Sequence, residues 1–219
     1  MDFNFIAKYT PEYWEAAKLT LTLSFYGILL SLVIGFLFSL IRYYKIPVLR
    51  RIVEIYIEIS RNTPLLIQLF FLYYGLPKMG VLLEAKTCAI VGLSFLGGSY
   101  MAESFRSGLE AVGKIQIESG LSIGLTKLQL IRYVILPQAL AISVPSLGAN
   151  AIFLLKETSL FSAVALADLM FVAKDLIGMY YKTNEALFML VLSYCIILLP
   201  LSFLLSRLER RLRYAGYGH

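Results

Sequence analysis

The stretch Glu118–Pro137 reads ESGLSIGLTKLQLIRYVILP and separates long apolar runs of the chain. Polar Ser, Thr, Gln and Lys residues interleave with Leu and Ile along it, and Thr126 is placed to cap a helix from Lys127 to about Leu136. Pro137 then marks a boundary, because proline disfavours a helical residue before it. A structured insertion of this length predicts a surface that holds another protein, although its amphipathic pattern also fits a helix lying on lipid.

The composition of the whole chain is that of an integral membrane protein. Of 219 residues, 59% are apolar and only 16% are charged, and the mean hydropathy is +0.76. The formal net charge of +6 then reflects Lys and Arg held on the cytoplasmic side, and no nucleic-acid partner is expected. His219 is the single histidine, so metal or histidine-based catalysis is not expected. Cys88 and Cys195 are expected to be small buried apolar residues.

Five apolar runs predict five transmembrane helices embedded in lipid, at residues 19–41, 55–76, 88–112, 139–155 and 187–205. The second run is interrupted by Arg61–Pro64. The fourth contains Pro145, Gly148 and Asn150, so we expect its helix to be discontinuous near the middle of the membrane.

These runs define a domain plan: an extracytoplasmic segment 1–18, a transmembrane domain 19–206 with a loop at about 113–137, and a basic tail 207–219. Residues 161–181 predict an external helix at the interface.

Basic residues are unevenly divided between the two sides that five crossings define. Four lie in each of the segments 42–51, 106–132 and 207–213, and seven are spread over the opposite side. Since the richer side of a membrane protein is cytoplasmic, we expect the N-terminus outside and both the 113–137 loop and the C-terminus inside.

Two local patterns concern packing and nucleotide binding. Small residues recur every fourth position in the first run, which predicts a face for close helix contact within the protein or with a second copy: Gly27, Ser31, Gly35 and Ser39. The stretch Gly108–Lys114 spells GxxxxGK, but Ile115 follows where a phosphate-binding loop needs Ser or Thr. We therefore expect any ATPase to be a separate chain.

Three motifs together resemble one family. Glu118-Ser119-Gly120, Gly124 and Ile135-Leu136-Pro137 resemble the EAA loop of ABC-importer permeases. Arg61-Asn62-Thr63-Pro64-Leu65-Leu66 with Gln68 resembles the RGTPLL-x-Q motif, and Lys156-Glu157-Thr158-Ser159-Leu160 resembles the KDTSL motif, of the polar amino-acid branch (histidine, glutamine, arginine or cystine permeases). Ser119-Gly120, Asn62 and Glu157 depart from the family pattern. The likeness extends over residues 15 to 210.

The resemblance implies an all-α type I ABC importer permease (MetI-like) fold with five transmembrane helices and a cytoplasmic coupling helix. The loop would dock on an ATPase subunit through Glu118, Ser119, Gly120 and Gly124. It implies two ABC ATPase subunits that hold ATP and Mg, a second permease copy or paralogue, and an extracytoplasmic substrate-binding protein. The chain would be no enzyme and would bind no cofactor itself. Its place would be the bacterial cell membrane.

Polar residues in or near the expected spans are candidates for the substrate path: Gln68, Glu103, Asn150, Lys156, Glu157 and Ser159. An amino-acid zwitterion needs a cation for its carboxylate, which Lys156 with Ser159 could supply, and an acceptor for its ammonium, from Glu157 or Glu103. Each has a structural alternative. Glu103 and Arg106 can form an ion pair, Lys156 and Glu157 can form a pair that locks the outer gate, and Arg61 can anchor the cytoplasmic edge.

Two other functions remain open from the residues. An autonomous channel or ion-coupled carrier would favour an internal repeat with matching broken spans, and an intramembrane enzyme would need a nucleophile–base pair or metal set that the spans lack. The sequence does not distinguish glutamine, glutamate, arginine, histidine and cystine as substrates, nor a homodimer from a heterodimer.

Overall fold

The computed structural model describes residues 1–216, with side chains through residue 211; it therefore leaves out the last part of the expected basic tail, including His219. Within this range the chain is helical and contains no strand. The α-helices are α1 (Phe3–Tyr43), α2 (Leu49–Asn62), α3 (Leu65–Phe70), α4 (Ala85–Ala111), α5 (Lys114–Ser122), α6 (Lys127–Leu130), α7 (Leu136–Glu157), α8 (Leu169–Tyr180) and α9 (Thr183–Gly216). Short π and 3-10 segments join them: η1 (Phe71–Gly75), η2 (Leu76–Met79), η3 (Ile131–Ile135) and η4 (Thr158–Val164).

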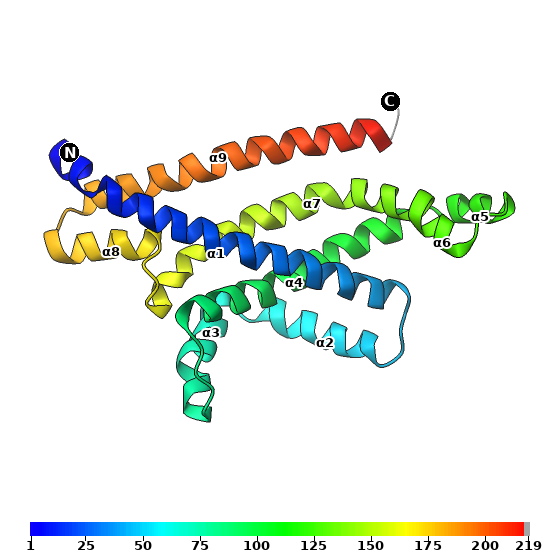
Figure 1. Cartoon of the computed structure of the whole chain (residues 1–219), viewed down its shortest axis with the longest axis horizontal. Coiled ribbons are helices and arrows are strands. Elements are labelled where there is room, and N and C mark those ends of the chain that lie inside the picture. Colours follow the sequence, from blue (N-terminus) through cyan, green and yellow to red (C-terminus); the bar gives the residue numbers. More distant parts are fainter. Residues whose placement is uncertain (217–219) are drawn as a thin grey trace.

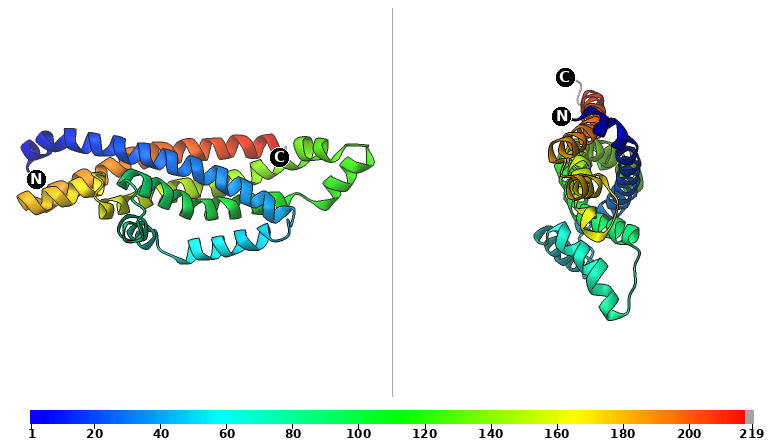
Figure 2. Two further views of the ribbon diagram at one scale, coloured as in Figure 1. Left: turned by 60° about the horizontal axis from the view of Figure 1, so that its bottom comes forward. Right: turned by 90° about the vertical axis from the view of Figure 1, so that its left-hand side faces the viewer.

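Four long helices, α1, α4, α7 and α9, run along one axis (Figures 1 and 2). We call the end formed by the N-terminus and α8 the α8 end, and the opposite end, where α5 and α6 project, the loop end. Helix α2 runs back along α4 from the loop end, and α3 then turns sharply away from the axis. The N-terminus lies at the α8 end and α9 ends toward the loop end, so the chain enters and leaves the bundle at opposite ends (Figure 1).

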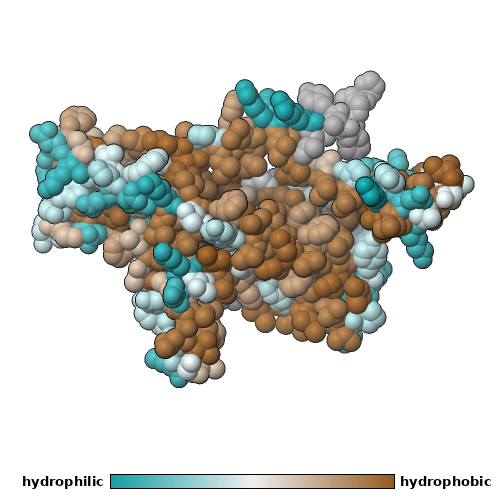
Figure 3. Space-filling view, in the orientation of Figure 1, coloured by the Kyte–Doolittle hydropathy of each residue, from teal (hydrophilic) through white to brown (hydrophobic). Residues whose placement is uncertain are grey.

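An apolar belt covers the middle of the bundle on the face shown in Figure 3, and hydrophilic residues gather there at the α8 end and around the loop end. By length and composition, three described helices can cross a membrane: Phe3–Tyr43, Lys127–Val164 and Thr183–Arg211. Helix α4 has 27 residues but is less apolar, and α2, at 14 residues or about 21 Å, is shorter than the roughly 30 Å hydrocarbon layer. The count of five crossings stays a prediction.

The small residues of α1 pack directly on α4, so this contact lies within the protein. All four positions of the expected face are buried: Gly27, Ser31, Gly35 and Ser39. A Cβ on Gly27 would meet the Leu93 side chain at 2.6 Å, and one on Gly35 would overlap Met101 and the backbone of α4. Any larger residue at Gly27 or Gly35 would therefore separate the two helices.

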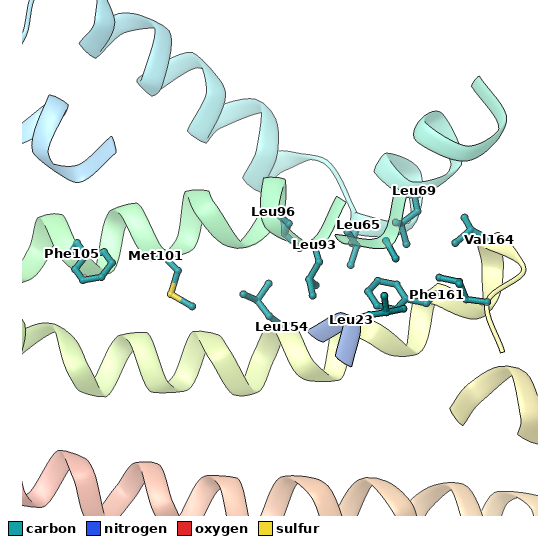
Figure 4. Packing of buried hydrophobic residues seen from close by; sticks show 12 residues of the cluster. Leu23, Leu65, Leu69, Leu93, Leu96, Met101, Phe105, Leu154, Phe161 and Val164 are labelled. Carbon is teal, nitrogen blue, oxygen red and sulfur yellow. The ribbon is translucent and has the colours of Figure 1, made fainter. Parts of the chain in front are cut away.

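One apolar core joins the helices around α4 (Figure 4). Leu93, Met101 and other side chains of α4 meet Leu23 of α1, Leu69 of α3 and Leu154 of α7, and Phe161 and Val164 of η4 close one side. Leu69, Leu93, Leu154 and Phe161 have no solvent exposure. In a bundle surrounded by lipid, such side chains stabilise the fold through close van der Waals packing.

The expected break in the fourth run is wrong, because α7 is a continuous helix through Pro145 and Gly148. Proline is tolerated inside a membrane helix when neighbouring groups cover the freed carbonyl. The helix packs on α4 and α9, and a Cβ added at Gly148 would make an ordinary van der Waals contact with Leu205, at 3.6 Å. Pro137 is also no boundary: the chain stays helical from Lys127 to Val164, and the π segment η3 precedes the proline.

Other boundaries also differ from the expectation. Helix α1 begins at Phe3, so segment 1–18 is continuous with the first span rather than separate from it. The second run does break, at Thr63 and Pro64, where the backbone is extended between α2 and α3. Cys88 is buried as expected, but Cys195 is exposed on α9. The GxxxxGK stretch begins inside α4, where Gly108 packs against Ala139 and Ser143 of α7.

Helix α8 packs against the bundle, and its position relative to lipid stays a prediction. Its buried residues pack with Tyr9 and Tyr13 of α1 and Met189 of α9 in a second core. Its N-cap, Asp168, is fully buried, and Asp168 Oδ1 accepts the Phe171 N–H at 2.9 Å. Within residues 1–211, neither Asp168 Oδ2 nor the Tyr194 hydroxyl has a hydrogen-bond partner. Burial raises the pKa of Asp168 to about 6, against partial compensation by backbone N–H groups and Lys174.

We expect this aspartate to make the protein more stable in mild acid. Because the folded pKa lies above the unfolded value of 3.8, the ionised carboxylate destabilises the fold above about pH 6, and that penalty disappears as the pH falls toward 4. Asp168→Asn keeps the helix cap and removes the charge, so it should raise stability at pH 8 by on the order of 2–3 kcal/mol and flatten the profile between about pH 4 and 6. Thermal denaturation in detergent tests this. If the stability of Asp168→Asn depended on pH in the same way as that of the parent protein, the expectation would be contradicted.

Candidate functional site

The loop end is built from two short helices joined by a tight turn. Helix α5 ends at Ser122, and Gly124 has φ +83°, a conformation that favours glycine. Thr126 caps α6 as the sequence predicted: its Oγ1 accepts the Gln129 N–H at 3.3 Å, and Gln129 Oε1 accepts the Thr126 N–H at 2.9 Å. This reciprocal capping box fixes the direction in which the chain enters α6 and η3.

The surface of this loop is apolar and uncovered. Ile115, Ile123 and Leu128 are 78%, 79% and 75% exposed, far more than core residues of the same type. Single exposed apolar residues are common, but a group on one protruding tip indicates a contact surface.

The four loop residues expected to dock occupy different environments. Glu118, Ser119 and Gly124 are exposed. Gly120 is buried, and a Cβ there would meet Leu130 at 2.5 Å, so this glycine lets α5 pack on α6 instead of lying at the surface.

A second candidate site brings two of the three sequence motifs together. The extended link between α2 and α3 and the end of α7 line one cavity of about 200 Å³, with these residues: Arg61, Asn62, Thr63, Pro64, Leu65, Leu96, Tyr100, Phe153 and Glu157. The Arg61 guanidinium lies 5.1 Å from the centre of the Tyr100 ring, a cation–π contact. The half-buried Glu157 carboxylate makes no hydrogen bond or ion pair with residues 1–211. The cavity thus holds one cation and one acceptor.

The neighbours of Glu157 are placed differently from the expectation. Lys156 is exposed, lies outside this cavity and forms no ion pair with Glu157 among the described residues. Ser159 is half-buried in η4 and also lies outside the cavity. Arg61 is not an anchor at the loop end. Helix α2 starts there at Leu49, and Arg61 lies in its last turn, away from the loop end. Sequence reasoning missed that Arg61 and Glu157 line one cavity, because it put them at opposite membrane faces.

Gln68 holds the break between α2 and α3. Its Nε2 donates to Ser60 O at 3.1 Å and to Thr63 O at 3.0 Å, so it satisfies two carbonyls that the end of α2 leaves open. The side chain is buried, and its Oε1 has no partner within residues 1–211. The position of glutamine in the motif therefore has a local structural cause.

Glu103 and Asn150 also make contacts within the bundle. Glu103 pairs with Arg106 at 2.7 Å, as the spacing predicted, and also with Arg42 of α1. Arg106 pairs in turn with Glu110. Asn150 Nδ2 donates to Ser104 Oγ at 2.9 Å and ties α7 to α4. Glu103 is thus neutralised by two guanidinium groups, whereas Glu157 is not.

The apolar belt, the uncovered helical loop at one end and the charged cavity near the other define an integral-membrane permease. A family model described as binding-protein-dependent transport system inner membrane component matches residues 27–214, and the chain belongs to that family.

Individual relatives agree with this assignment. The glutamine transport system permease protein GlnP of Escherichia coli (strain K12) is 35% identical over 97% of this chain and 98% of its own length. A solved structure of an amino acid ABC transporter with histidines has a TM-score of 0.89 at 34% identity, covering 96% of this chain and 99% of that one. An inward-facing structure of the MetNI methionine ABC transporter shares the fold at 23% identity, with a TM-score of 0.74 over 97% and 99% of the two chains. The chain therefore has the MetI-like permease fold.

We expect the loss of the Gln68 amide to weaken the fold. Gln68→Met keeps the volume but leaves the Ser60 and Thr63 carbonyls unsatisfied, which should lower the free energy of unfolding by about 1–3 kcal/mol. The measurement is the melting temperature in detergent beside the parent protein. A Gln68→Met protein as stable as the parent that nevertheless fails to transport would assign Gln68 to the substrate path instead.

Proposed function

We propose that this chain is the translocation subunit of an ATP-driven importer for a polar amino acid, and that it moves substrate inward by alternating access coupled to a separate ATPase. Family membership together with the apolar tip formed by Ile115, Ile123 and Leu128 carries the proposal. A partner subunit that covers the tip gives those side chains a buried environment.

The helices attached to the tip give it a mechanical connection to the cavity. The chain is helical without interruption from Lys127 to Val164, so a rod about 45 Å long joins α6 to Glu157. The other attachment, α4, contributes Leu96 and Tyr100 to the same cavity. Movement of the tip by an ATPase would thus displace two walls of the cavity as rigid bodies.

The cavity fits the charges of an amino-acid zwitterion. Glu157 would accept a hydrogen bond from the ammonium group of the substrate. Arg61, rather than Lys156, would bind the substrate carboxylate through its planar guanidinium. At about 200 Å³ the cavity is smaller than the 300–1,000 Å³ typical of ligand pockets, which favours completion of the path by a second permease copy or paralogue. Which polar amino acid it takes is left to binding measurements.

The remaining partners follow from this arrangement. Two ATPase subunits would hold ATP and Mg. Each would bind the loop end of one permease subunit, through Glu118, Ser119 and Gly124 as well as the apolar tip. The excess of Lys and Arg supports placement of the loop end in the cytoplasm of a bacterium and the α8 end outside. An extracytoplasmic substrate-binding protein would then deliver substrate at the α8 end.

Leu128→Glu is expected to uncouple the transporter. Leu128 is 75% exposed in the first turn of α6, where an acidic residue suits the helix dipole, so the permease itself should stay folded. A charge buried against the ATPase should weaken assembly by about 2 kcal/mol or more and lower ATP-driven uptake in proteoliposomes at least tenfold.

The matched control is Leu82→Glu, which places the same charge at an 83% exposed leucine between η2 and α4. This variant should transport normally. Full uptake by Leu128→Glu would refute docking through this tip, and uptake by the purified chain without ATP would favour a channel or ion-coupled carrier.

Glu157→Gln should separate substrate handling from coupling. It removes the charge that faces the ammonium and leaves the tip untouched, so uptake should fall about tenfold or more while complex assembly and basal ATPase activity persist. Lys156→Gln changes the adjacent exposed charge and should have little effect. If Lys156→Gln abolishes uptake and Glu157→Gln does not, the assignment of charges in the cavity is wrong.

A further inference from the structure

A large cleft lies at the loop end of α2, outside the sites described above. Its volume is about 730 Å³, and the loop after α1 and the first turns of α2 line it: Lys45, Pro47, Val48, Arg50, Arg51, Ile52, Glu54 and Ile55. The loop is held in place, because the Ile46 N–H donates to Ile41 O at 3.1 Å and the Arg50 N–H to Ile46 O at 3.0 Å. Lys45 and Val48 have φ of 51° and 67°, conformations that persist only where the surroundings fix them.

The charges of this cleft are not balanced within the chain. Arg50 Nε donates to Glu54 at 2.7 Å, which satisfies that pair. Lys45 and Arg51 are exposed, and neither side chain has a hydrogen bond or ion pair with residues 1–211. Two cations beside a neutral pair attract an anionic group.

An apolar stripe leads away from these cations along the outer face of α2. Val53, Ile57 and Ser60 face the bundle and are buried, whereas the stripe residues on the opposite face, Ile52, Ile55 and Ile59, are 57%, 59% and 55% exposed. From Ile52 to Ile59 the helix advances about 10 Å.

The stripe ends in a second cavity, of about 420 Å³. Ile59 belongs to both the stripe and this cavity, whose lining is apolar except for Thr63 and Gln68: Ile59, Thr63, Ile67, Gln68, Phe71, Leu72, Val91, Gly92 and Phe95. Charge at the end of the bundle is thus followed, toward its middle, by a stripe and a pocket suited to hydrocarbon.

We propose that this face of α2 binds one anionic phospholipid, with the phosphate between Lys45 and Arg51 and an acyl chain along the stripe into the 420 Å³ cavity. The order of charge and apolar surface along α2 matches the order of headgroup and tail in the leaflet at the loop end. A soluble anion would leave the stripe uncovered. A two-fold contact with a second copy centred on this cleft would bring the unpaired cations of both copies together.

The test is native mass spectrometry of the delipidated permease–ATPase complex, titrated with palmitoyl-oleoyl phosphatidylglycerol or with the zwitterionic phosphatidylcholine of the same chains. The parent complex should bind phosphatidylglycerol in preference to phosphatidylcholine. Lys45→Gln with Arg51→Gln should weaken that binding about 10- to 30-fold and leave phosphatidylcholine binding unchanged. The control pair Arg210→Gln with Arg211→Gln removes the same charge from the exposed end of α9 and should have no effect.

Further arms separate lipid from other occupants. Ile55→Ser with Ile59→Ser should weaken phosphatidylglycerol binding while the melting temperature is unchanged, because both side chains are exposed. Millimolar glycerol phosphate should not displace the lipid. Displacement by glycerol phosphate, no preference between the two lipids, an equal effect of the control pair, or efficient crosslinking of Ile55→Cys to a second copy in native membranes would each overturn the proposal.

Discussion

The whole bundle depends on how closely its neighbours approach α4. Ser31 of α1 lies against Gly97, Tyr56 of α2 against Gly98, and Ser143 of α7 against Gly108, so three helices contact α4 where it has no side chain. In lipid, helices associate through such close packing and through hydrogen bonds, since hydrocarbon offers no hydrophobic gain between them. Because α4 is covered on these sides, it can carry serine, glycine and charge in the middle of a membrane protein.

The polar groups inside the bundle have two different roles. Most of them are bonded to the backbone or to each other: the Tyr56 hydroxyl donates to Phe95 O at 2.6 Å, and Ser60 donates to the same carbonyl at 2.9 Å. In surroundings of low dielectric such bonds fix helix positions. Glu157 differs because its carboxylate has no partner within residues 1–211, and Arg61, which lines the same cavity, contacts the Tyr100 ring and makes no hydrogen bond or ion pair within that range. This difference, and not polarity itself, separates a candidate binding site from the scaffold around it.

Sequence patterns anticipated the features that depend on neighbouring residues alone. Thr126 capped its helix, and the stripe beginning at Gly27 packed as expected, because spacing along a helix fixes which side chains share a face. Patterns failed where neighbours distant in sequence decide. Pro145 does not break α7 because α4 and α9 support it, and Gly120 is buried because α6 folds back onto it. The turn between α2 and α3 places Arg61 in the same cavity as Glu157, and no local pattern specifies this turn.

The π segment η3 sets how the protruding loop is oriented on α7. Ile131–Ile135 forms wider turns than an α-helix, which insert the equivalent of one extra residue just before Pro137. One residue corresponds to about 100° of rotation in an α-helix. If these turns tightened to α-helix with all residues retained, Leu128 and the rest of the tip would therefore turn by about that angle around the axis of α7. In the docking proposed above, a backbone irregularity away from the contact surface would thus set the direction from which an ATPase approaches the tip.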